Sequence, residues 1–229
     1  MCSSDLPTPP NAAMLKPFLQ PIFGKDRAGR LTVKGYVDTA GSLCRQVRAS
    51  LPAFFGQADA FIARHGFHPA QCQISSGTLE HPEAQLLEFA RRFHQAGFTL
   101  HNHAIGDQSV HVAIDAIEAA RRSDGVSSQP DAIAHLQVVA PGDVVRIGHD
   151  RIYTAFTFAW ANALKDYDMT VMPFIDQVRG NTDAALYTTR NYTYRQTYPA
   201  QSVLQAGAPV VGGSDAPIET RDPRPFYNI

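Results

Sequence analysis

The chain has 229 residues, a formal net charge of −1 and a hydrophobic content of 44%, which is enough apolar material for a sizeable globular core. The near-neutral charge gives no reason to expect binding to nucleic acid or to an anionic membrane. No apolar run is long enough to span a bilayer, and the first residues have neither the basic region nor the apolar region of a signal peptide.

The three cysteines, Cys2, Cys44 and Cys72, show no CxxC spacing. This pattern is typical of reduced thiols in a cytosolic protein rather than of a disulfide framework or a zinc ribbon. An odd number of cysteines does not exclude one bridge, but nothing in the sequence argues for it. We therefore expect a cytoplasmic protein with reduced thiols.

Residues 1–30 contain five prolines and are predicted to be an irregular segment. From Leu31 onward, β-prone runs alternate with helical patterns, which implies a parallel sheet and the α/β class. Residues 158–194 show no clean period, and a loop this long inside a compact domain is usually functional or disordered. The predicted strands are 31–38, 71–75, 98–103, 132–137, 151–157 and 208–211, and the predicted helices are 52–65, 82–95, 107–122, 141–147 and 195–205.

Two histidines, His101 and His103, stand at the end of the predicted strand 98–103, just before a turn and a helix. Asp107 is a good N-cap for that helix. The carboxyl ends of parallel strands are where ligands and metals bind in α/β sheets and barrels. Five predicted strands end in polar residues, which indicates one shared site: Lys34 and Asp38, His101 and His103, His135 and Gln137, Thr157, and Ser214 and Asp215.

His103 is the first candidate ligand, because a neutral imidazole is the commonest metal ligand in proteins. The alternative is a buried histidine that hydrogen-bonds the following helix. His101 lies two residues earlier on the same strand face, so a chelate by both rings is geometrically feasible, but a residue that fills a layer inside the barrel is the better interpretation. His135 stands at the equivalent place in the next predicted strand; a lone histidine at a strand end is more often structural, but this repetition strengthens the case for a ligand.

Asp215 follows an apolar strand in a Gly-Gly-Ser-Asp turn. It is either a plain turn residue or a metal-bound carboxylate that takes a proton from water. Lys34 is either a site residue or a surface lysine on an edge strand. Asp107 is more readily an N-cap than a catalyst, and Trp160 is more readily a core residue than a substrate platform. The remaining histidines have no ligand spacing and are predicted to lie on the surface: His65, His68, His81, His94, His111 and His149.

Three strings in this order, His103–Asp107 (HAIGD), Ala134–Gln137 (AHLQ) and Gly213–Pro217 (GSDAP), resemble the metal-dependent amidohydrolase superfamily. The first and third resemble its amidohydrolase-3, or YtcJ-like, branch, whose members are similar to formamide deformylases and related hydrolases of non-peptide C–N bonds. The resemblance covers roughly residues 34–229.

This resemblance implies a (β/α)8 barrel of the TIM type with a metal centre at its carboxyl face. By resemblance, His103 and His135 are the ligands of the fifth and sixth strands, and Asp215 is both a ligand and the catalytic proton acceptor of the eighth. Lys34 resembles the fourth-strand lysine that can be carboxylated to bridge two metals. The ligand set makes zinc the expected divalent metal, and the expected substrate is a small amide-like molecule.

The sequence has no upstream counterpart of the two-histidine motif that the family places on its first strand, and Ala134 stands where an acidic residue is usual. We therefore expect residues 31–229 to be an incomplete barrel, roughly strands 4 to 8, from a fragment of a longer enzyme. The alternative is a non-catalytic remnant, or a half barrel completed by a partner, with at most weak metal binding. A different hydrolytic or isomerising chemistry on the same metal site is a third hypothesis.

Overall fold

The computed structural model describes residues 12–126 and 129–215, and the chain divides into two compact units. One unit contains Lys16–Gly77 and Lys165–Arg195. The other contains the described residues 12–15, Thr78–Leu164 and 196–215. No helix among the described residues is both long enough and apolar enough to cross a membrane.

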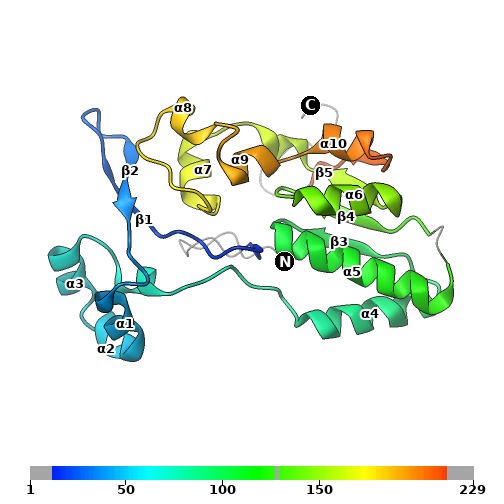
Figure 1. The fold of residues 1–229 in the computed structure, drawn as a ribbon, viewed down its shortest axis with the longest axis horizontal. Helices are drawn as coiled ribbons and strands as arrows, with labels where there is room; N and C mark the ends of the chain where they lie inside the picture. The colour runs from blue at the N-terminus through cyan, green and yellow to red at the C-terminus, as the bar shows by residue number, and fades with distance from the viewer. Residues whose placement is uncertain (1–11, 127–128, 216–229) are drawn as a thin grey trace. The chain divides into compact units, whose positions relative to one another are not determined.

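A parallel sheet organises the second unit (Figure 1). Within the described residues it has four strands in the order β3-β4-β5-β6. Helices α4, α5, α6 and α10 accompany these strands, so the unit is a mixed α/β fold that is compatible with part of an α/β barrel. The bounds are β3 (His101–Ala104), β4 (Ala132–His135), β5 (Tyr153–Phe156), β6 (Val210–Gly212), α4 (Glu83–Gln95), α5 (Asp107–Asp124), α6 (Pro141–His149) and α10 (Ala200–Gln205).

The two faces of this sheet have different surroundings. Side chains alternate between the faces of a strand, and the register aligns Ile133 with Thr154 on one face. Both residues are fully buried, and Ile133 packs in the main core with Ile114 and Ile117 of α5. His103 is aligned with Ala134 on the opposite face and is exposed. The helices therefore cover one face of the sheet, whereas the histidines of β3 lie on the other.

The start of α5 differs from the prediction, which made Asp107 the N-cap. Gly106 is the N-cap, and Asp107 lies in the first turn, where it is 1% exposed. Its Oδ1 accepts a hydrogen bond of 2.7 Å from the backbone N–H of Leu15. A Cβ on Gly106 would lie 2.1 Å from the carbonyl oxygen of Ala13. The Gly-Asp pair of the HAIGD string therefore holds residues 13–15 against the helix start.

The strand predicted at 31–38 is present, but its expected place in the parallel sheet is wrong. In the structure β2 (Leu31–Tyr36) pairs antiparallel with β1 (Pro21–Lys25), inside the segment that was predicted to be irregular. Asp26 Oδ1 closes the connecting turn by accepting hydrogen bonds from the N–H groups of Ala28 and Arg30, and Gly29 has a φ of 78°. The prolines of residues 1–30 led to the prediction of an irregular segment, so the hairpin turn at Asp26 was not recognised from the sequence.

The helices of the first unit are shorter than predicted, and one of them replaces a predicted strand. The predicted helix 52–65 is divided into α2 (Leu51–Phe55) and α3 (Ala58–His65), and α1 (Ser42–Ala49) precedes them. The predicted strand 71–75 is wrong, because Pro69–Cys72 forms a 3-10 helix, η1. His68 caps η1 by accepting a hydrogen bond at Nδ1 from the N–H of Ala70.

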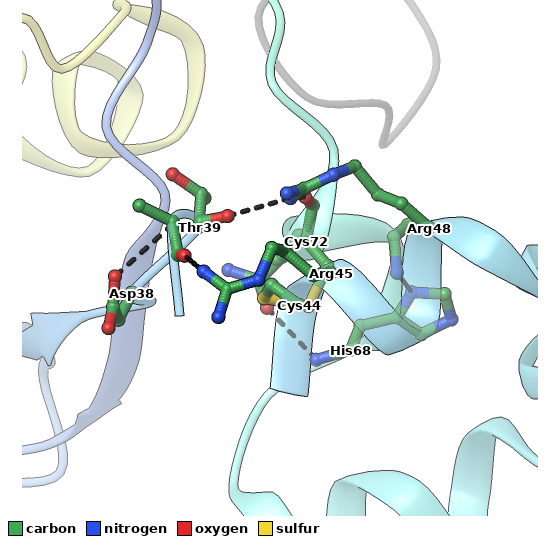
Figure 2. The surroundings of a disulfide bond; sticks show 10 residues. Asp38, Thr39, Cys44, Arg45, Arg48, His68 and Cys72 are labelled. Atoms are coloured by element: carbon green, nitrogen blue, oxygen red, sulfur yellow. Dashed lines mark hydrogen bonds between the residues drawn. A yellow bond between two sulfur atoms is a disulfide. The ribbon is translucent and has the colours of Figure 1, made fainter. Parts of the chain in front are cut away.

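A disulfide joins Cys44 of α1 to Cys72 of η1 (Figure 2), so the prediction of reduced thiols is wrong for this pair. Both cysteines are buried, in a cluster with Val47 and Phe61. Arg48 adds a second link, because its guanidinium donates to the carbonyl oxygens of Thr39 and Cys72. The 28-residue separation gave no local signal, since only tertiary packing brings the two cysteines together.

Residues 158–194, predicted as a loop, contain several short helices. Val33 of β2 packs with Met169, Phe174 and Val178 from this segment, and the hydroxyl of Tyr36 donates to the carbonyl of Val178. The segment therefore supplies part of a core in the first unit. Its helices are η2 (Phe158–Ala161), α7 (Lys165–Val171), α8 (Asp183–Leu186) and α9 (Tyr192–Gln196).

Candidate functional site

His103 and His135 meet at the carboxyl end of the parallel sheet. In the register of β3 and β4, Ala104 is the neighbour of His135, so His103 stands one position earlier on its strand. The two imidazole centroids are 4.4 Å apart, and the ring planes are inclined at 64°. Strand alternation alone would direct the two rings to opposite faces of the sheet, so their contact depends on His135 leaving the strand conformation, with a φ of 74°.

His135 ends β4 in an unusual backbone conformation. Its φ is 74° and that of Leu136 is 46°, values that residues with a side chain adopt rarely. The hydrogen bond from the N–H of Leu136 to the carbonyl of Ala104 continues the ladder beyond the strand. Strained backbone of this kind clusters at binding sites, where the surrounding structure enforces it.

The His135 ring is buried and is held by two further contacts. Its Nδ1 lies 2.9 Å from Oγ1 of Thr157, the residue directly after β5. The indole of Trp160 stacks on the imidazole with a centroid distance of 4.8 Å and an interplanar angle of 10°. The contact with Thr157 and the stack on Trp160 together orient the His135 ring at the carboxyl end of the sheet.

His103 is also affected by its surroundings. Loss of hydration around the ring lowers its pKa below the usual value, whereas the negative charges of Asp215 and Glu80 act in the opposite direction. A lowered pKa favours the neutral ring, which is the form that binds metals. Asp215 has a φ of 54° and is close enough to interact electrostatically with His103.

The donor set of this site fits part of a metal coordination sphere. Zinc binds histidine nitrogen at about 2.0–2.1 Å and usually takes four ligands, so two imidazoles in contact match two of those positions. In residues 12–126 and 129–215, no group of three or more His, Cys, Asp or Glu side chains is arranged to hold an ion. The described residues thus provide a pair of nitrogen donors rather than a complete site.

Lys34 belongs to the other unit, on β2 of the antiparallel hairpin. Ile22 faces Gly35 and Phe23 faces Val33, so Lys34 is the extra residue at the register shift. It is exposed, and a Cβ on Gly24 would lie 2.9 Å from its Cγ. The stem of the lysine therefore covers a glycine on the neighbouring strand.

His101 is exposed and shares the strand face of His103. Trp160 and Glu80 are the neighbours that the sequence did not identify as part of the site. Trp160 lies three residues after Thr157, whose polar side chain ends a predicted strand, and that spacing was the available signal. Glu80 precedes a helix with no recognisable motif, so no local pattern distinguished it.

The sequence matches the profile of the amidohydrolase family over residues 25–228. The chain therefore belongs to this family, in its amidohydrolase-3 branch. No curated protein matches the sequence significantly.

Two solved structures resemble the chain, both of uncharacterised metal-dependent hydrolases. The one from Pyrococcus furiosus has 20% identity and a TM-score of 0.47, with 70% of this chain and 28% of that chain covered. The one from Pyrococcus horikoshii OT3 has 18% identity and a TM-score of 0.46, with 65% and 25% covered. The matched part thus spans about a quarter of each of those proteins.

Proposed function

We propose that this chain is part of a metal-dependent hydrolase that cleaves non-peptide C–N bonds in a small amide-like substrate. The observation that carries the proposal is the contact between His103 and His135 at the carboxyl end of the sheet. Family membership and the electrostatic interaction of Asp215 with His103 support it. The proposal includes a barrel of the TIM type, in which β3 to β6 would correspond to strands 5 to 8, whereas β2, expected as strand 4, pairs with β1 instead.

Each site residue has a chemical role in this proposal. His103 and His135 would hold the ion, and zinc is preferred because nitrogen and carboxylate ligands suit it. A divalent metal in such a site lowers the pKa of its water toward ~7 and polarises a carbonyl. Asp215, an additional ligand in the family resemblance, would accept the proton from that water and pass it to the leaving nitrogen. Lys34 remains a proposed carboxylated ligand.

Metal content tests the proposal directly. The purified full chain should retain about one zinc ion after gel filtration, and His103→Ala and His135→Ala should each lose most of it. His149→Ala is the matched control, because that imidazole is 84% exposed and pairs with Asp150 on the surface. Equal zinc in all four proteins, or none in wild type, would contradict the proposal. Hydrolysis of amide substrates by wild type but not by Asp215→Asn would support the role of the carboxylate.

A half barrel with weak metal binding and no catalysis is the second candidate. The sheet face that carries His103 also exposes Tyr153 and Val211 among the described residues, and an exposed sheet face of this kind can serve as an interaction surface. Zinc binding without hydrolysis by the isolated chain, followed by hydrolysis when a longer parent protein is assayed, would favour this candidate over an active fragment.

The proposed cytoplasmic location needs a separate test. It rested on reduced cysteines, and the Cys44–Cys72 disulfide removes that support, since disulfides persist mainly in oxidising compartments. Thiol counting on protein isolated under alkylating conditions decides the point. Three free thiols would agree with the cytoplasm, and a single free thiol would contradict it.

A further inference from the structure

We infer that Thr157 and Trp160 are positioning residues for His135: Thr157 fixes the ring nitrogen Nδ1, and Trp160 fixes the ring plane. This inference rests on the proposed function, because it concerns how His135 presents its imidazole ring to a metal. Neither residue is a proposed ligand. Both follow β5 closely in the sequence, so one short segment would set the orientation of a ligand that belongs to β4.

The contact with Thr157 gives Nδ1 of His135 a buried partner. Thr157 is 2% exposed and His135 is 6% exposed, so the 2.9 Å contact between Oγ1 and Nδ1 is sheltered from competing water. A histidine that binds metal through one ring nitrogen usually hydrogen-bonds through the other, and this outer contact fixes both the tautomer and the ring orientation. Thr157 is the neighbour that meets this requirement at His135.

The stack with Trp160 restricts the rotation of the imidazole ring. The indole is nearly parallel to the imidazole, at 10°, whereas the ring of His103 is inclined to it at 64°. Rotation of the imidazole about its bond to Cβ would break the parallel stack and move Nδ1 away from Thr157. The two contacts therefore define one orientation between them.

The backbone at His135 makes such support necessary. His135 and Leu136 both have positive φ values, so the chain leaves the regular strand conformation at the point where the ligand is attached. The alternation of side chains along a strand no longer determines the direction of the ring. Side-chain contacts from the segment after β5 then take over that function.

Trp160 also supplies the spectroscopic signal for a test, because it is the only tryptophan in the chain. Zinc binding at a ring stacked directly on the indole should change its fluorescence. We expect a saturable change in wild type, lost in His135→Ala and kept in His149→Ala. Zinc affinity is measured in parallel by competition with a chromophoric chelator, which also serves variants that lack the indole.

Pairs of disruptive and conservative variants separate the loss of ring orientation from a general loss of packing. Thr157→Val and Trp160→Leu should weaken zinc binding by about 10- to 100-fold, while Thr157→Ser and Trp160→Phe should stay within about threefold of wild type, since they keep the hydroxyl and the aromatic plane. Tyr153→Leu is the control for loss of an aromatic residue from β5. Circular dichroism identifies any unfolded variant, and the conservative variant then decides for that residue.

The outcomes distinguish this inference from the proposed function. If wild type binds zinc and both Thr157→Val and Trp160→Leu bind it equally well, the inference is overturned and the proposed function stands. If Thr157→Ser or Trp160→Phe fold but are as weak as the disruptive variants, the specific roles assigned to the hydroxyl or the aromatic plane are overturned. If wild type binds no zinc, the proposed function fails and the inference fails with it.

Discussion

The two ends of strand β4 each adjoin a buried histidine with different partners. At the amino end, Asp131 directly precedes the strand and contacts His94 of α4. Both ring nitrogens of His94 face carboxylates, with Nδ1 at 2.5 Å from Asp124 and Nε2 at 3.2 Å from Asp131. At the carboxyl end, His135 has a neutral hydroxyl at one nitrogen and an indole against its face.

The difference shows which buried histidine could bind a metal. Carboxylates contact both nitrogens of His94, so neither nitrogen faces an open position where a metal could bind. This residue was predicted to lie on the surface, which is wrong, because it is 2% exposed. Arg121 completes the cluster by donating to Asp131 over 2.8 Å and to the carbonyl of Asp150. The amino end of β4 thus joins α4 and α5 to the sheet, whereas the carboxyl end carries the proposed ligand His135.

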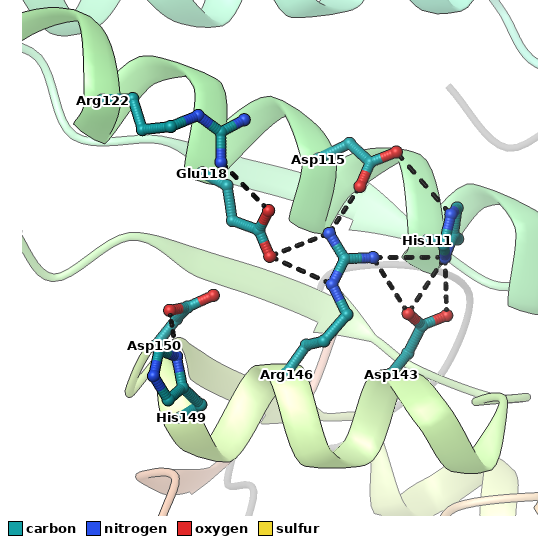
Figure 3. A network of polar contacts seen from close by, with 8 residues as sticks. All are labelled: His111, Asp115, Glu118, Arg122, Asp143, Arg146, His149 and Asp150. Carbon is teal, nitrogen blue, oxygen red and sulfur yellow. Dashed lines mark hydrogen bonds and ion pairs between the residues drawn. The ribbon is translucent and has the colours of Figure 1, made fainter.

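Another group of charged side chains, between α5 and α6, lies nearer to solvent than the cluster of Asp131 (Figure 3). Arg146 of α6 donates to Asp115 and Glu118 of α5, and His111 pairs with Asp143. Arg146 and Asp115 are each 27% exposed, so water competes with these contacts and each contributes little to stability. The cluster of Asp131 is therefore expected to contribute more to stability than this one because its charges are buried, not because it has more ion pairs.

The most severe test of the comparison is Asp131→Ala. It would leave Arg121 and His94 without their shared buried partner, and breaking one partner of a buried pair costs about 3–5 kcal/mol. We expect the free energy of unfolding, measured by urea denaturation, to fall by that amount. Asp115→Ala is the exposed control, with an expected loss of about 1 kcal/mol or less. Equal losses in the two variants would show that the amino end has no special structural role.

Gly106→Ala examines the carboxyl end of the neighbouring strand β3, where Gly106 begins helix α5 and we expect a purely structural effect. The new Cβ would lie 2.1 Å from the carbonyl oxygen of Ala13, so residues 13–15 must move or the start of α5 must shift. Such overpacking costs about 1–3 kcal/mol. Gly142→Ala in α6 is the matched control, since its Cβ would meet no atom within 4 Å. A helical alanine there should leave stability unchanged or raise it by up to about 1 kcal/mol.

The sequence predicts the second unit well because its signals are local. Helices α4 and α5 follow apolar residues at helical spacing, and their predicted ranges, 82–95 and 107–122, differ from the observed ones by two residues or fewer. The first unit was predicted poorly. Its hairpin depends on a turn at Asp26, and its disulfide joins residues that only packing brings together.

The candidate site shows the same division. His103 and His135 could be identified because each lies at or near the end of a predicted strand, but their contact also needs the positive φ at His135, which the sequence did not indicate. The stack of Trp160 on His135 could not, since it depends on the conformation of the chain after β5. The burial of His94 was equally hidden, because its partners Asp124 and Asp131 lie 30 and 37 residues further along.

The smallest expected effect concerns pH at the amino-end cluster. A hydrogen bond from the N–H of Val126 and the contact with His94 lower the pKa of Asp124 below its usual value. The stabilisation is therefore fully present above the unfolded pKa, about 3.9, and is lost as the pH falls through the lower folded pKa.

Asp124→Asn should consequently be slightly less stable than wild type at pH 7. Its free energy of unfolding should also fall less steeply than that of wild type between about pH 4 and pH 2. The check is urea denaturation across this range, with the exposed Asp59→Asn as control. Parallel pH profiles for wild type and Asp124→Asn would mean that the carboxylate adds nothing to the cluster, and that Asp131 and Arg121 alone hold the amino end of β4. A flatter profile for Asp124→Asn alone would extend the structural role of this end to both carboxylates around His94.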